Sequence, residues 1–299
     1  MDTVCSGKQW DVALVMERDD TVAAAMPYLI GSKWGLRYIL QPQLTQYNGP
    51  WYNYSCIHRG SECLVSEYER LAFEKKTTGG LIAQLSALRL ACYNQCFSPS
   101  VTNWQPFYEY GFHQTTRYTY QIPDISDPQS LFSTFTEPRR KKIRRADHLM
   151  MLAESTDAEW FADFHIAYWR SKGQENLLPR QLMVSLCREA INRKSGAILQ
   201  LLDADQNVVA AIFVVYDSNC AYLLQSAMNM EHYHNENISI LIWKALHWLS
   251  TKTKSFDFEG SMIAGIEQFN RSFGAIQTPY FNVYKYSNPL IEWVVEHRK

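Results

Sequence analysis

Two blocks of sequence occur twice in the same order, and this internal repeat limits the possible folds more than any other feature. ERDDTVAAAMPYLI, from Glu17, resembles DADQNVVAAIFVVY, from Asp203, since each is a polar turn followed by a short alanine pair and an apolar strand. FYEYGFHQTTRYTY, from Phe107, resembles FNRSFGAIQTPYFNVY, from Phe269. The offset falls from roughly 187 to roughly 162, so we expect an insertion of about 25 residues within 50–80. Chance similarity of hairpins and glycine turns is the alternative.

The periodicity of the apolar residues predicts an α/β fold with a mixed sheet. A hairpin and further strands precede helices at 65–75 and 79–92, and Pro138 marks the start of a basic helix at 137–148. The second half predicts helices at about 156–171, 179–194 and 237–253, and strands at GAILQLLD, NVVAAIFVVYD, CAYLLQSAM, FDFEG and YFNVYKY. We therefore expect a first domain at 1–136, a basic linker helix at 137–150 and a second domain at 151–299.

Composition and charge exclude several classes of protein. The 299 residues are 46% hydrophobic, which favours packed globular domains over disorder. The formal net charge of -1 gives no global attraction to nucleic acid or to a membrane surface. The N-terminus shows no basic segment leading into a long apolar run, and the apolar run from Val208 to Tyr216 has the length of a strand. We expect a cytoplasmic protein without a membrane span.

The cysteines favour free thiols over a disulfide framework or a metal site. Seven cysteines are an odd number scattered over a large chain. Four of them, with a nearby histidine, invite comparison with a zinc site, but their spacing lacks the C-x2-C knuckle: Cys56, His58, Cys63, Cys92 and Cys96. We expect reduced thiols and no metal.

Several motifs together resemble the GNAT superfamily. The order hairpin, strand, helix, strand, helix, strand is that of a GNAT domain, and FYEYGF at 107–112 resembles its Fy-x-x-x-GF segment. FDFEGSMIAGIEQFNRSFGA at 256–275 resembles the signature of the Fem-like branch, and IRRADHLMML at 143–152 is similar to that branch's entry into its second domain. The resemblance implies two tandem GNAT domains. It also implies an N-acyltransferase that moves an acyl group from an acyl-CoA, or a similar thioester, to an amine on an amino sugar, a peptide or an amino acid.

Two departures from the family patterns keep other functions open. MEHYHNENIS at 230–239 has no glycine where CoA-dependent GNAT domains carry a glycine loop for the diphosphate. Asn270 stands where Fem-type transferases commonly carry a lysine. One alternative is an aminoacyl-tRNA-dependent transferase acting on a cell-wall precursor, although tRNA is not favoured. The other is a catalytically silent binding protein with a GNAT fold. The sequence indicates no oligomeric state.

Acyl transfer to an amine needs a proton acceptor, and two groups of residues are candidates. In the predicted strand FDFEG the period of two places Asp257 and Glu259 on one face. Partial burial and a like charge nearby would raise their pKa values toward neutrality, as a general base requires. An exposed edge, or pairing with Arg271, is the alternative. His234, beside His232, precedes the long helix and can shuttle a proton, although loop histidines are commonly solvated.

The remaining candidates are binding residues. Three polar residues before and within the start of the long helix can cap it and leave N–H groups for the cofactor's phosphates: Asn235, Asn237 and Ser239. The expected substrate-binding residues are Tyr222, Gln225, Tyr47, Trp51, Asn270 and Arg271. Packing in the core is the alternative for the aromatic ones. The basic run from Arg139 to Arg145 can contact phosphates of tRNA or form a solvated helix face.

Overall fold

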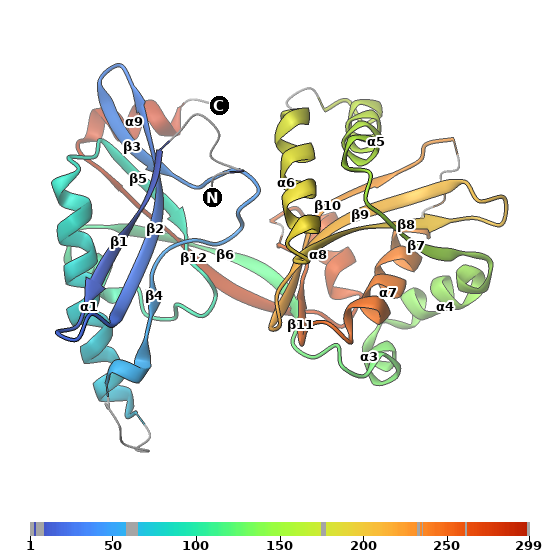
Figure 1. The fold of residues 1–299 in the computed structure, drawn as a ribbon, viewed down its shortest axis with the longest axis horizontal. Coiled ribbons are helices and arrows are strands. Elements are labelled where there is room, and N and C mark those ends of the chain that lie inside the picture. Colours follow the sequence, from blue (N-terminus) through green and yellow to red (C-terminus); the bar gives the residue numbers. More distant parts are fainter. Residues whose placement is uncertain are drawn as a thin grey trace. The chain divides into compact units, whose positions relative to one another are not determined.

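The computed structural model describes residue 3 and residues 9–57, 65–174, 178–231, 234, 236–260 and 262–297. The chain forms two compact units, each of strands and helices (Figure 1). The first unit contains Met1–Arg117 and Pro279–Lys299, and the second contains Tyr118–Thr278. The predicted α/β fold with a mixed sheet is confirmed. The ranges 1–136, 137–150 and 151–299, expected for the two repeated domains and the linker helix between them, stay a prediction.

In the first unit the strand order is β1-β2-β3-β5-β12, and β4 pairs with β2. Its strands are β1 (Gln9–Met16), β2 (Val22–Lys33), β3 (Leu36–Leu40), β4 (Trp51–Tyr52), β5 (Cys92–Cys96) and β12 (Ile276–Tyr286), of which β12 begins in the second unit. Its helices are η1 (Tyr54–Cys56), α1 (Glu67–Ala87), α2 (Gln105–Glu109) and α9 (Pro289–Glu296). The sequence analysis did not predict α9.

Helix α1 is one helix, where the sequence analysis predicted two. Ser66 and Glu69 form a capping box at its start. Gly79 and Gly80 do not interrupt it, because they lie where the helix approaches its neighbours. A Cβ on Gly80 would come within 2.8 Å of Val15 Cγ2 on β1. The glycines therefore permit close packing of α1 rather than ending it.

In the second unit the strand order is β6-β11-β10-β9-β8-β7. The pairing of β10 with β11 is parallel, and that of β11 with β6 is antiparallel. The strands are β6 (His113–Ile122), which begins in the first unit, β7 (Met151–Ser155), β8 (Gly196–Leu202), β9 (Val208–Tyr216), β10 (Cys220–Met228) and β11 (Ser255–Asp257). The helices are α3 (Pro128–Thr134), α4 (Glu137–Ala146), η2 (Asp147–Leu149), α5 (Ala158–Ser171), α6 (Arg180–Asn192), α7 (Asn237–Leu249) and α8 (Ala264–Arg271).

The helices of the second unit cover both faces of its sheet. Helices α5 and α6 pack on one face, where Phe161 contacts Phe213 of β9, and α7 packs on the other with α3 and α4 (Figure 1). Because both faces are covered, the central strands are apolar on both sides, as the run in β9 shows. Helix α4 begins where Pro138 predicted a helix start.

The two copies of the repeat have matching local structure. In the turns at 17–21 and 203–207 the first residue exchanges the same backbone hydrogen bonds with the fourth and fifth, and Asp20 and Gln206 have φ of 62° and 65°. Gly111 and Gly274 also match, with φ of 74° and 71°. These parallels agree with a duplication, which stays a prediction. The last strand after each glycine turn ends in the other unit, since β6 pairs with β11 and β12 with β5.

Two further expectations concern cysteines and membrane spans. Five cysteines are free thiols, as predicted: Cys56, Cys92, Cys96, Cys187 and Cys220. Cys63 and His58 lie outside the described residues. Within the described part of the chain, no helix is both long enough and apolar enough to cross a bilayer.

Candidate active site

Asp257, the last residue of β11, is a buried carboxylate whose oxygens are occupied. It has no exposed surface. Its Oδ1 accepts hydrogen bonds from Thr119 Oγ1 of β6 and, at 2.7 Å, from the backbone N–H of Glu259, and its Oδ2 accepts one from Gln121 Nε2 at 2.9 Å. A buried carboxylate needs such partners, because burying it without hydrogen bonds costs free energy. Asp257 therefore anchors the end of β11 to β6 and holds the turn that follows.

Glu259 lies in that turn, whereas the sequence analysis predicted that it lies in the strand. The strand ends at Asp257, and Glu259 has a φ of 59°. The expectation that one strand places both carboxylates on the same face is therefore wrong. Gly260, with a φ of 66°, comes so close to β6 that a Cβ would lie 2.5 Å from the carbonyl oxygen of Tyr118. A non-glycine residue in the left-handed region is uncommon and costs about 1 kcal/mol, and such residues gather at functional sites.

The pKa of Glu259 is raised for the two reasons that the sequence suggested. Burial and, second to it, the negative charge of Asp257 raise the pKa of Glu259 to about 8. The side chain is therefore protonated at neutral pH and becomes a base near pH 8. Arg271 does not neutralise it, because both of its bonds go to Glu267, at 2.6 and 2.9 Å. A carboxyl group tuned in this way suits proton transfer near physiological pH.

Tyr222 and Gln225 lie on β10, next to β11. Tyr222 stands opposite Asp257 in the parallel pairing, so the two side chains share a face of the sheet. Burial, followed by the nearby Cys220, raises the pKa of the Tyr222 phenol, which therefore keeps its proton. Gln225 pairs with Phe213 of β9, whose ring contacts Phe161 of α5. Both residues thus lie on the face of the sheet that α5 and α6 cover, and the structure brings Tyr222 close to Asp257.

The predicted phosphate site at the start of α7 has a different arrangement. Asn235, like His232, lies outside the described residues, and His234 is exposed. Asn237 and Ser239 are buried inside the first turn of α7, and Glu236, at the capping position, makes no side-chain capping hydrogen bond. The Ser239 hydroxyl instead accepts a hydrogen bond from Arg139 of α4. The expectation that these two residues cap the helix is wrong, because Glu236 stands at the capping position, and their cofactor-binding role stays a prediction.

The other candidate residues fall in separate places. Asn270 on α8 is 3% exposed, and its Nδ2 has no hydrogen-bond partner among the described residues. In the first unit, Tyr47 packs edge-on against Tyr280, with ring centroids 5.2 Å apart. Trp51 on β4 is 56% exposed. The acceptor-binding role predicted for Tyr47, Trp51 and Asn270 stays a prediction.

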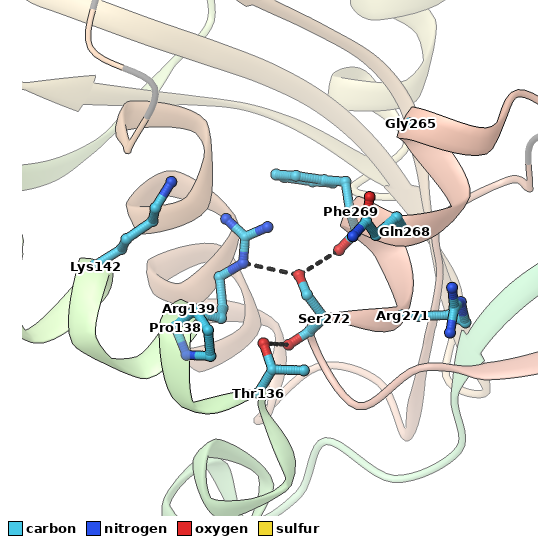
Figure 2. Close-up of a pocket in the computed structure, with 9 residues that line it drawn as sticks. All are labelled: Thr136, Pro138, Arg139, Lys142, Gly265, Gln268, Phe269, Arg271 and Ser272. Carbon is cyan, nitrogen blue, oxygen red and sulfur yellow. Dashed lines mark hydrogen bonds between the residues drawn. The ribbon is translucent and has the colours of Figure 1, made fainter.

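A cavity of about 630 Å³ lies between α4 and α8 of the second unit (Figure 2). Its lining consists of Thr136, Pro138, Arg139, Lys142, Gly265, Gln268, Phe269, Arg271 and Ser272. Arg139 is central to it: its Nε donates to Ser272 Oγ at 2.9 Å, and its guanidinium lies over the rings of Phe269 and Phe273. Burial lowers the pKa of Arg139 to about 10, so the group is still charged at neutral pH.

The sequence analysis treated Arg139 and Lys142 only as part of a basic run. A signal for their position was present. Ile143 is the only large apolar residue in the helix EPRRKKIRRA and is buried. Arg139 precedes it by four residues and Lys142 by one, so helical spacing places Arg139 on the buried side.

A protein-family model matches the part of the chain that contains these residues. Residues 137–269 match the model of the acetyltransferase (GNAT) domain, a range that contains α4, Tyr222 and Glu259. This part of the chain is therefore similar to GNAT domains. No curated protein sequence matches the chain.

Solved structures extend the likeness over almost the whole chain. FemX is similar with a TM-score of 0.69 at 11% identity, covering 98% of this chain and 91% of that chain. L-PGS from Bacillus licheniformis gives 0.57 at 10%, covering 98% and 89%. A tandem GNAT protein from the clavulanic acid biosynthesis pathway gives 0.52 at 9%, covering 95% and 85%. At these identities the likeness concerns the fold, and the predicted GNAT-type, Fem-like fold is confirmed.

Proposed function

We propose that the chain is an N-acyltransferase that transfers an acyl group from an acyl-CoA to an amine, with Glu259 as the general base. The observation that carries the proposal is the partly buried Glu259, whose pKa of about 8 suits it to accept a proton near neutral pH. The GNAT domain at residues 137–269 supports the reaction class.

In this reaction the amine nitrogen attacks the thioester carbonyl, a C–N bond forms and the C–S bond breaks. An ammonium group first loses one proton to solvent, and the ionised Glu259 accepts the second proton, which the nitrogen releases as the C–N bond forms. The Tyr222 phenol keeps its proton because its pKa is raised, so it can donate a hydrogen bond to the leaving thiolate, which takes its proton from solvent. Asp257 acts through Glu259: it accepts the backbone N–H of Glu259 and adds the charge that raises its pKa.

The acceptor classes that we propose are amino sugars, peptides and amino acids, and we propose the cytoplasm as the place of action. The rival tRNA-dependent reaction has less support. Of the cations on α4, Arg140 and Lys141 pair with Glu137, and Arg145 pairs with Glu236. These partners reduce the positive charge available to a polynucleotide.

The test is a thioester assay with the purified chain. Acetyl-CoA and longer acyl-CoAs are each combined with a panel of amino sugars, amino acids and peptides, and the acylated amine is detected by mass spectrometry. We expect kcat/KM to rise with pH toward a plateau above about pH 8, following Glu259. Glu259→Gln is expected to lower kcat roughly 10²–10⁴-fold and to remove this rise.

The matched control is Glu189→Gln, on the surface of α6, where Glu189 pairs with Arg193. This variant should keep both the rate and the pH profile. Product formation from charged tRNA, and none from any thioester, would contradict the proposed donor. A Glu259→Gln variant with the rate of the unmodified protein would remove Glu259 as the base.

A further inference from the structure

Arg139 is a half-buried charged group for which no counter-ion is found in the described part of the chain. Hydroxyl groups of Ser272 and Ser239 accept its hydrogen bonds, and phenylalanine rings flank it at 4.5 and 4.6 Å from its Cζ. Among the described residues no carboxylate forms an ion pair with it. Burying a charge without an opposite charge is costly, and a bound anion would offset that cost.

Lys142 adds a second cation to the same cavity. It follows Arg139 by three residues, and Figure 2 shows both side chains extending from one side of α4. Lys142 is exposed, and no ion pair of Lys142 occurs within the described ranges. Arg271, paired with Glu267, also lines the cavity, and no acidic residue is among the described residues of the lining. The charged side chains of this described lining are thus all positive.

We infer that the cavity between α4 and α8 binds the phosphoryl group of a small-molecule ligand. The Arg139 guanidinium and the Lys142 ammonium offer several N–H donors, which match the oxygens of a phosphate. Thr136, Ser272 and Gln268 add neutral polar groups to the lining. A cavity of about 630 Å³ exceeds the size of a phosphate and falls in the range of small-molecule pockets. This inference does not depend on acyl transfer.

The alternative phosphate position, the start of α7, is already occupied by the protein. Glu236 precedes its first turn and pairs with Arg145 at 2.9 Å, which places a negative side chain where an anion would bind. The Ser239 hydroxyl is engaged with Arg139. The cavity therefore offers the better-matched charge. An extended polynucleotide is a poorer match, because most other cations of α4 have acidic partners.

The test is calorimetric titration of the full chain with inorganic pyrophosphate at low salt. We expect binding that weakens roughly tenfold in Lys142→Gln, which removes one charge-assisted contact. Lys141→Gln is the matched control, since it changes the same charge on the neighbouring residue, which does not line the cavity. A Cβ on Gly265 would meet nothing within 4 Å. Gly265→Leu therefore tests the cavity without touching Arg139, and it should weaken binding by filling the space.

Three competitors identify the source of the phosphate. Displacement of pyrophosphate by CoA, but not by pantetheine, would show that the donor's own phosphates occupy the cavity. Pyrophosphate binding without competition by CoA would support the anion site and show that its ligand is not the acyl donor. Failure to bind pyrophosphate, or equal affinity in Lys142→Gln, Gly265→Leu and Lys141→Gln, would overturn the inference. Displacement by tRNA with equal losses in Lys141→Gln and Lys142→Gln would also overturn it.

Discussion

Replacing Glu259 by glutamine should stabilise the protein at alkaline pH while it removes the proposed base. The pKa of Glu259 rises from 4.5 to about 8 on folding. Between these two values the native state keeps a proton that the unfolded chain has released, so stability falls as the pH rises. Each pH unit in this window costs about 1.4 kcal/mol. By pH 9 the total reaches about 3–5 kcal/mol, a large part of the stability of an ordinary domain.

The measurement is urea denaturation of the unmodified protein and of Glu259→Gln from pH 5 to pH 9. The difference in free energy of unfolding isolates Glu259, because the other titrating groups are common to both proteins. We expect the variant to gain stability relative to the unmodified protein as the pH rises, with the gain levelling off above about pH 8. Glu189→Gln should show no such trend. A constant difference across this range would refute the raised pKa and the reasoning built on it.

Three further predictions follow from the same region and from the core. Asp257→Ala should destabilise the protein by about 2–4 kcal/mol, because it leaves the buried Thr119 hydroxyl and the half-buried Gln121 amide without their acceptor. It should also shift the pH profile of activity to lower pH, since the charge that raises the pKa of Glu259 is lost; an unchanged profile would contradict this. Gly260→Ala should cost about 1–3 kcal/mol in thermal unfolding, because of its φ and its contact with Tyr118, whereas Gly265→Ala should be near neutral. Equal melting temperatures would contradict that contrast. Burial raises the pKa of the Cys187 thiol to about 12, so labelling with a thiol reagent should require unfolding, and rapid labelling of the native protein would disagree.

Local features of the molecule could be predicted from the sequence because they depend on neighbouring residues. The polar turns before β2 and β9 and the glycines at 111 and 274 follow from backbone preferences. The periodicity of apolar residues located α5, α6 and α7 within a few residues of their observed ends. The motif FDFEG made Glu259 a candidate base, which stays a prediction, and the two causes of its raised pKa, burial and the charge of Asp257, were predicted correctly.

Only the tertiary structure decided where side chains point when distant segments meet. The close approach of β6 to the end of β11 ends that strand at Asp257 and turns Glu259 into the left-handed region. Packing of α4 on α7 buries Ser239 and directs Arg139 into the cavity. Ser239, predicted to cap the helix, instead accepts a hydrogen bond from Arg139. The final strands pair across long separations in the chain. Such pairings depend on the burial of whole surfaces, and no local sequence preference determines them.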